Sequence, residues 1–204
     1  MKPKYVLALV LALILAGCTA PQTGGEGKFE LLVSDAPAAI DDFDSLEVSF
    51  SEARVFKGEG GNESFESIDI EGRTVDLTQV KGARAKSLLN TTLETGTYTK
   101  IELHASDNRG IVNGEEVAVK IPPGKLMITK DFEIKPDKTT EFVFDIQVVL
   151  RGNQRNNQGY ILKPVISKSG VVGKDVERKS GKGDKGGKED KKTPPRSQGK
   201  PEGV

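Results

Sequence analysis

Residues 28–168 are expected to form an all-β fold, an antiparallel β-sandwich. Apolar and polar residues alternate with a period of two along most of this stretch, as they do in half-buried strands. Gly, Asn, Asp or Pro separates about nine such runs, a spacing typical of strands that are joined by turns in two packed sheets. One segment, 79–90, has the composition of a short helix or a turn, and Gly82 within it weakens a helix.

The predicted strands follow one another at short intervals. In the second predicted strand, the apolar residues stand at even positions up to Phe50 and at odd positions from Ala53 onward. This shift predicts a bulge or bend near Ser51–Glu52. Asn113 and Gly114 stand at the turn of a predicted hairpin, because both accept the positive φ angles that such turns need. The predicted strands cover residues 29–33, 46–55, 65–70, 75–77, 101–105, 111–112, 117–121, 126–128, 132–134, 142–148 and 160–162.

The N-terminal residues have the pattern of a lipoprotein signal peptide. Lys2 and Lys4 precede the uncharged, largely apolar run Tyr5–Ala16. This run is shorter than the roughly 20 residues of a membrane-spanning helix and has the length of a secretory signal core. It ends in Leu15–Cys18, with the sequence Leu-Ala-Gly-Cys, which resembles the lipobox of bacterial and archaeal lipoproteins.

Cys18 is the only cysteine of the chain and the expected site of lipidation. Its thiolate is the nucleophile best suited to take up a diacylglyceryl-type group. We therefore expect residues 1–17 to be removed and the lipid on Cys18 to hold the protein at the extracytoplasmic face of the cell membrane. The alternative is an ordinary signal peptide that is cut near Ala20.

Composition divides the rest of the chain into three parts. Residues 18–27 are rich in Gly and are expected to be a flexible tether, followed by the β-sandwich at 28–168. Residues 169–204 are rich in Lys and Gly and are expected to be a disordered tail, because they lack the apolar residues that could offset the entropy of ordering.

Charge is distributed unevenly between these parts. Residues 21–167 hold 17 basic and 24 acidic side chains, a net charge of −7, whereas residues 168–204 hold 11 basic and 6 acidic side chains, a net charge of +5. The basic tail could contact anionic lipid or an envelope polymer, and a solvated, solubilising extension is the alternative. Nucleic acid is not expected as a partner, because the protein is exported and no aromatic residue interleaves these lysines.

Several segments of the predicted body resemble those of exported lipoproteins catalogued as domain of unknown function 4382. The resemblance extends over about residues 30–167 and implies a β-sandwich, similar to immunoglobulin-like or transthyretin-like modules, on a lipid anchor. It implies no activity, and it assigns no catalytic or ligand-binding residue. The segments that carry it are Ser34–Pro37, Phe50–Val55, Val75–Thr78, Gly96–Ile101, Gly124–Ile128 and Tyr160–Ile166.

Four aspartates form the one candidate metal site. Asp35, Asp41, Asp42 and Asp44 fall within a short stretch, and no Lys or Arg occurs between positions 29 and 53. Calcium takes six to eight hard oxygen ligands, and a loop rich in carboxylates can supply several of them. The spacing lacks the pattern of an EF-hand loop, so a solvated acidic loop is the alternative. No other cofactor is expected.

Four further features are assigned to ordinary structural roles or left open. His104, the only histidine, is expected to be an exposed strand residue that faces outward with Glu102. The Gly-rich stretch 58–62 is expected to be a hairpin loop. Asn62 and Asn90 match the N-glycosylation sequon, which matters only if the source organism glycosylates exported proteins.

Three functional hypotheses follow from these features. The leading one is a non-enzymatic, membrane-tethered module that binds or scaffolds a partner outside the cytoplasm. The second is a lipoprotein that binds a solute or Ca²⁺ through the loop from Asp35 to Asp44. The third is an enzyme that uses carboxylates alone, as glycosidases do. The absence of Trp argues against the third, because such enzymes usually offer aromatic platforms to sugars.

Overall fold

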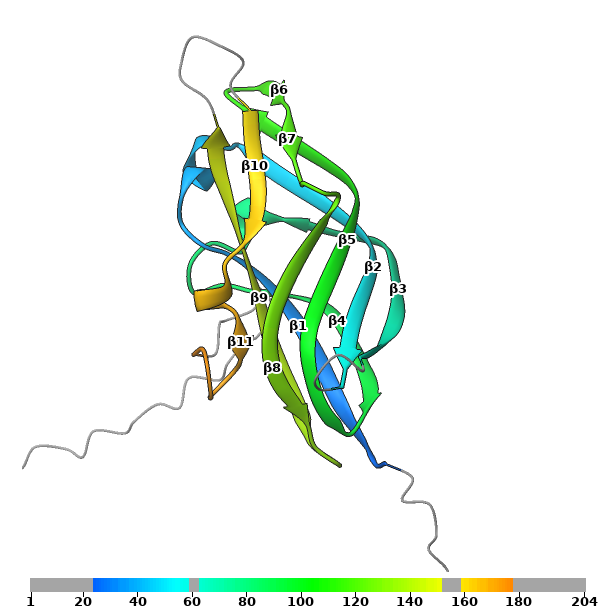
Figure 1. Ribbon diagram of the computed structural model, residues 1–204. Coiled ribbons are helices and arrows are strands. Elements are labelled where there is room, and N and C mark those ends of the chain that lie inside the picture. Colours follow the sequence, from blue (N-terminus) through cyan, green and yellow to red (C-terminus); the bar gives the residue numbers. More distant parts are fainter. Residues whose placement is uncertain (1–23, 59–62, 152–158, 178–204) are drawn as a thin grey trace, which may run out of the picture.

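The computed structural model describes residues 24–58, 63–151 and 159–177. These residues form eleven β-strands and three short 3-10 helices (Figure 1), so the prediction of an all-β protein is confirmed. No helix in these ranges is long and apolar enough to cross a membrane. The predicted signal peptide with Cys18, positions 59–62 of the predicted loop and most of the predicted tail lie outside the described residues. The 3-10 helices are η1 (Ala39–Asp42), η2 (Leu77–Gln79) and η3 (Ile166–Lys168).

One of the two sheets is antiparallel throughout. Its order is β3-β2-β5-β6, and β8 also pairs with β5. The predicted bulge is confirmed, because the register of β2 shifts between Phe50 and Glu52. The predicted hairpin is confirmed as well, with Asn113 and Gly114 at φ angles of 51° and 78° between β5 and β6. The strands are β2 (Ser45–Lys57), β3 (Ser64–Asp76), β5 (Gly96–Val112), β6 (Glu115–Val117) and β8 (Lys125–Ile134).

The other sheet is mixed and curls into half a barrel (Figure 1). Its order is β4-β1-β9-β10-β7, with β11 beside β9. The strands β1 and β9 run parallel, as do β10 and β7, so the prediction of an entirely antiparallel fold was wrong here. The strands are β1 (Glu26–Asp35), β4 (Lys86–Glu94), β7 (Val119–Lys120), β9 (Thr139–Arg151), β10 (Gly159–Pro164) and β11 (Gly170–Val171).

Burial on both faces explains why β1 accepts a parallel neighbour. All residues from Leu31 to Asp35 are buried, and β9 is buried continuously from Phe142 to Ile146. Parallel strands occur mostly where both faces of a sheet are covered. The alternation in sequence identifies which side chains face the core, but it does not reveal the direction of the adjacent strand.

The segment 79–90 forms the turn that was the alternative to a helix, at Gly82 and Ala83, and then a strand. Only its first residue belongs to η2, and β4 begins at Lys86. Pairing with β1, which aligns Phe29 with Thr91 and Leu31 with Leu89, supplies the hydrogen bonds of this strand. Tertiary pairing therefore overrides a weak local preference.

An aromatic cluster lies in the core that the two sheets share. The Phe132 ring of β8 lies with its centroid 5.3 Å from that of Tyr98, on β5 of the same sheet. It also lies 5.5 Å from Phe29 and 5.1 Å from Phe142, which belong to the mixed sheet. All four side chains are buried. Phe132 therefore joins the two sheets through ring contacts.

A C-terminal segment, defined here as residues 165–177, packs on the outer face of the mixed sheet. Within it, β11 pairs with β9, and Val172 and Val176 pack against a small second core of Leu32, Ala85 and Val143. The body therefore continues to residue 177, past the expected boundary at 168. It also begins earlier, because β1 starts at Glu26 within the predicted tether.

Candidate functional site

In the acidic loop from Asp35 to Asp44, which was expected to bind Ca²⁺, neighbouring carboxylates contact different parts of the chain. Asp41, exposed in η1, forms an ion pair with Lys81, with 2.8 Å between Oδ1 and Nζ. Asp42 is also exposed, and its Oδ2 accepts a hydrogen bond from the Tyr160 hydroxyl at 3.3 Å. These two neighbouring carboxylates are thus held by different segments of the chain.

The other two aspartates of the loop have different surroundings. Asp35 is fully buried at the end of β1, whereas Asp44 is exposed and accepts a hydrogen bond from the backbone N–H of Gly114 at 2.8 Å. Within residues 24–58, 63–151 and 159–177, no three His, Cys, Asp or Glu side chains are grouped so that they could hold a metal ion. The structure therefore gives the four carboxylates separate surroundings, with Asp35 buried and the other three exposed.

The two sequon asparagines differ in what the structure describes. Asn90 is exposed on β4 and lies opposite Glu30 of β1. Asn62 lies outside the described residues. The structure therefore leaves Asn90 accessible for modification but adds nothing about Asn62.

The outer face of the antiparallel sheet carries a buried carboxylate. Glu102 on β5 points away from the core, between Ile101 and Leu103, yet it is only 4% exposed. Its Oε2 lies 2.9 Å from Lys125 Nζ and 3.4 Å from His104 Nε2. Burial by itself would raise the pKa of Glu102, but the hydrogen bond and charge of Lys125, aided by His104 and Lys100, hold this pKa below its usual 4.5.

His104 lies between two carboxylates rather than exposed as expected. Only 23% of its side chain is exposed, because Glu102 and Glu52 flank the imidazole, with 3.9 Å from Nδ1 to Glu52 Oε2. Glu52 is itself paired with Arg54 at 2.8 Å and accepts a hydrogen bond from the Ser67 hydroxyl. In the described part of the chain no hydroxyl is hydrogen-bonded to the imidazole. The arrangement fixes charges on the outer face of the sheet.

Replacement of Glu102 by glutamine tests this charge cluster through the pH dependence of stability. The folded-state pKa of Glu102 is depressed, so its carboxylate stabilises the fold above about pH 4.5, and this contribution is lost as the pH falls below that value. We expect Glu102→Gln to lower the free energy of unfolding by about 1 kcal/mol near neutral pH. We also expect the urea midpoints of the variant and the wild type to converge at acidic pH. The exposed replacement Glu115→Gln is the control, and an equal difference at every pH would contradict the role of Glu102.

An aromatic patch, defined as Arg54, Phe56, Phe65 and Lys100, lies at one end of this outer face. Phe65 on β3 is 55% exposed, and its ring centroid lies 5.3 Å from that of Phe56 on β2. The guanidinium of Arg54 lies 5.3 Å from the Phe65 ring, and Lys100 Nζ lies 3.7 Å from the Phe56 ring. Cations over aromatic rings hold these side chains in defined positions.

The sequence contained a signal for this patch. Phe56 and Phe65 stand on opposite sides of the Gly-rich stretch 58–62, and in a hairpin they become cross-strand partners, as β2 and β3 show. A cross-strand aromatic pair with one exposed ring beside Arg is uncommon on a surface that only needs to be soluble. The other exposed large apolar side chains in the described residues are Met127, Leu150 and Ile166.

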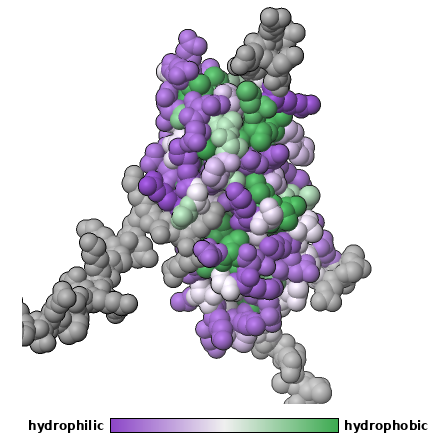
Figure 2. All heavy atoms as spheres, turned by 90° about the vertical axis from the view of Figure 1, so that its left-hand side faces the viewer, coloured by the Kyte–Doolittle hydropathy of each residue, from purple (hydrophilic) through white to green (hydrophobic). Residues whose placement is uncertain are grey.

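On the opposite side of the molecule, the large apolar side chains that are exposed among the described residues are aliphatic. Figure 2 shows the side on which β9, β10 and the C-terminal segment lie, with apolar areas that are separated by hydrophilic side chains. Leu150 and Ile166 are 43% and 54% exposed, respectively. Scattered exposed apolar residues of this kind are ordinary on a soluble domain.

Comparison with known proteins gives one match. A family model described as "Domain of unknown function (DUF4382)" matches residues 26–164, which is more than half of the chain. The match begins with the first residue of β1 and ends with the last residue of β10, so the C-terminal segment lies beyond it. No curated protein is significantly similar to this chain. No solved structure matches it either.

Proposed function

This chain belongs to the family that shares the domain of unknown function DUF4382, and from this premise we propose that it is a non-enzymatic, lipid-anchored binding module outside the cytoplasm. The family description names no activity, so the proposal depends on the residues of the chain itself. The observation that carries it is the lipobox pattern Leu15–Cys18 after an uncharged apolar run. Two lipid chains on Cys18 would hold the protein stably at a membrane.

The fold is compatible with such an anchor. Two sheets around one shared core fit a sandwich of the immunoglobulin-like or transthyretin-like kind, which we include in the proposal. The segment between Cys18 and the start of β1 at Glu26 would span roughly 16 Å as a flexible chain. That distance is sufficient to hold the body clear of the lipid headgroups.

The aromatic patch is the surface that we propose for partner binding. Aromatic side chains and Arg dominate the binding energy of many protein interfaces, because they bury a large area at a small entropic cost. The ion pair between Lys100 and Glu63, at 3.3 Å, holds the edge of the patch in place. The carboxylates of Glu52 and Glu102 lie beside the aromatic patch, and with Arg54 of the patch they supply fixed charges that can orient a partner.

Replacement of Cys18 by alanine tests the anchor. We expect the wild-type protein to sediment with membranes, and the Cys18→Ala variant to move to the soluble fraction or to accumulate as an uncleaved precursor. Cell fractionation with mass spectrometry of the N-terminus measures both outcomes, and Thr19→Ser is the control that keeps the thiol. A Cys18→Ala variant that remained in the membrane fraction in its mature form would contradict the anchor.

A photo-cross-linker at position 65 tests the binding surface. With p-benzoylphenylalanine in place of Phe65, illumination of intact cells is expected to give a discrete covalent adduct of higher mass. The same amino acid at the exposed position Lys163 on β10 is expected to give none. Mass spectrometry of the adduct identifies the partner. Equal adducts from both positions, or none from position 65, would rule out the aromatic patch as the binding surface.

A further inference from the structure

A hollow of about 510 Å³ lies between the end of β8, the start of β9 and the C-terminal segment. Three lysines line it, and they come from separate places: Lys135 follows β8, Lys138 precedes β9, and Lys174 follows β11. Glu133 and Glu141 also line the hollow, so its ammonium groups outnumber its carboxylates. Val171 and Val172 form part of its apolar wall.

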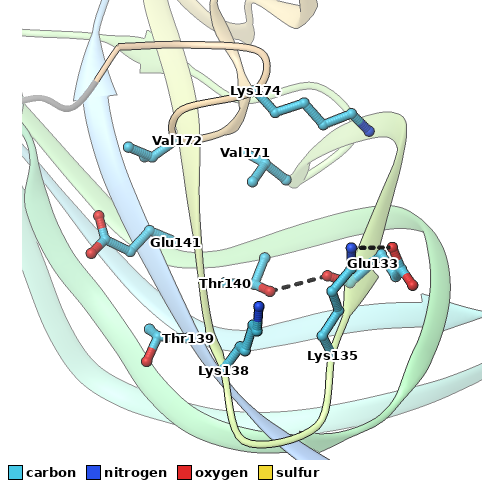
Figure 3. A pocket seen from close by; sticks show the side chains of 9 residues that line it. All are labelled: Glu133, Lys135, Lys138, Thr139, Thr140, Glu141, Val171, Val172 and Lys174. Carbon is cyan, nitrogen blue, oxygen red and sulfur yellow. Dashed lines mark hydrogen bonds and ion pairs between the residues drawn. The ribbon is translucent and has the colours of Figure 1, made fainter.

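The three lysines lie around the same hollow, with the ammonium of Lys135 turned to Glu133. Figure 3 shows Lys138 pointing into the hollow from the turn between β8 and β9, and Lys174 reaching along the opposite rim. Glu141 lies across the hollow from Lys135. Lys135 Nζ forms an ion pair with Glu133 at 3.2 Å, whereas the Nζ atoms of Lys138 and Lys174 have no ion pair or hydrogen bond to a residue within the described ranges.

The framework of the hollow is held by hydrogen bonds that leave the ammonium groups of Lys138 and Lys174 available. The Thr140 hydroxyl donates to the carbonyl of Glu133 at 3.0 Å, which joins β9 to β8. The N–H of Val172 donates to the carbonyl of Glu141 at 2.9 Å, which joins the C-terminal segment to β9. Two ammonium groups without an ion pair, beside a third that is paired with Glu133, favour an anion with several oxygens, because it accepts charge-assisted hydrogen bonds from more than one of them.

The hollow lies at the end of the molecule where the chain enters the body. The N–H of Lys28 donates to the carbonyl of Lys138 at 2.9 Å, and the N–H of Asp137 donates to the carbonyl of Glu26 at 3.2 Å. The turn that carries Lys138 is therefore bonded to the first residues of β1. With the lipid anchor proposed above, this end would be the one nearest the membrane.

We propose that Lys135, Lys138 and Lys174 form a binding site for the phosphate of an anionic lipid headgroup. The assignment of a lipid as the source of the phosphate depends on the proposed membrane anchor, whereas the binding of a phosphate group depends only on the hollow. Lys174 lies beyond the residues that match the family model, so the site is completed by a segment outside that domain. The lipid would then orient the body as well as tether it.

Acetylation rates of individual lysines test the proposal on the full chain in a non-ionic detergent, read by mass spectrometry. When glycerol phosphate is added at about four times its Kd, mass action predicts that Lys138 and Lys174 are acetylated about five-fold more slowly. Lys120 on β7 and Lys163 on β10, both exposed at other places, are expected to react at unchanged rates. Glycerol without phosphate is the ligand control.

The source of the phosphate is tested with lipid in the same detergent. Phosphatidylglycerol is expected to protect Lys138 and Lys174, and phosphatidylcholine, whose headgroup has no net charge, is expected to protect neither. Lys138→Glu should abolish the protection of Lys174, whereas the matched variant Lys120→Glu should preserve it. Both variants reverse one exposed charge. A difference between them in the protection of Lys174 is therefore due to the position of Lys138 in the hollow.

Each remaining outcome overturns part or all of the proposal. Equal protection of all lysines, or protection of none, would eliminate the site. Protection by glycerol phosphate but not by phosphatidylglycerol would leave a site for free phosphate and refute the lipid as its source. Because the detergent keeps the full chain in solution whatever is attached to Cys18, a failure of the anchor does not affect this measurement.

Discussion

Replacement of Phe132 by alanine is expected to lower the free energy of unfolding by about 3–5 kcal/mol. The ring is 2% exposed and contacts aromatic rings from both sheets. Its removal leaves a cavity that Phe29, Tyr98 and Phe142 cannot fill, because each is held by its own strand. The loss combines the transfer of the ring to water with the cost of the cavity.

Urea denaturation measures this loss as a lower midpoint with an unchanged slope. Phe65→Ala is the matched control, since it removes the same ring from an exposed position on β3. We expect it to cost about 1 kcal/mol or less, which corresponds to its contacts with Phe56 and Arg54. Similar losses for the two variants would mean that Phe132 does not join the sheets in the way described.

Replacement of Gly27 by alanine is expected to destabilise the protein by about 1–3 kcal/mol. A Cβ at this position would lie 2.3 Å from the carbonyl oxygen of Lys135 and 2.8 Å from the Ile134 side chain. The oxygen belongs to the backbone, so β1 and the turn after β8 would have to separate. Gly27 was assigned to the flexible tether, but in the structure it is a buried residue of β1.

Gly159 provides the control for this substitution. It begins β10, and a Cβ there would meet no atom within 4 Å. Gly159→Ala is expected to change the midpoint of thermal unfolding little, or to raise it slightly by restricting the unfolded chain. If Gly27→Ala were equally well tolerated, the close approach of β1 to the turn after β8 would be wrong.

Alternation in the sequence predicted most strands of the fold and the sides that they bury. The parity change after Phe50 predicted a real bulge, and Asn113–Gly114 predicted a real hairpin turn. Both are local features, determined by a few consecutive residues. Sequence patterns are most informative about structure of this kind.

Features that depend on distant partners were not predictable in the same way. The strand β4 forms because β1 offers it hydrogen bonds, and the packing of the C-terminal segment depends on Leu32 and Val143, whose side chains face away from the main core. In the sequence, Leu32 and Val143 are apolar where the alternation calls for a polar residue. This pattern indicates that both faces of the strand are apolar, but it does not indicate what covers the second face. What covers the second face is a segment that contacts residues as distant in sequence as Leu32.

The candidate sites show the same limit. The aspartates of the acidic loop are close in sequence but have separate partners in the structure. Conversely, Lys138 and Lys174 are far apart in sequence and line the same hollow. The pair of Phe56 and Phe65 was predictable in principle, because hairpin pairing relates residues on either side of one short loop.

The parallel pairing of β1 with β9 has a consequence for the order in which the protein can fold. Ser34 of β1 and Asp145 of β9, which are hydrogen-bonded, are separated by 111 positions. The earliest strand to emerge from the ribosome therefore lacks one lateral neighbour until most of the chain has been made. Topologies dominated by such remote contacts reach their native state over milliseconds to seconds. A chain that ended before Asp145 would leave that side of β1 without its native neighbour.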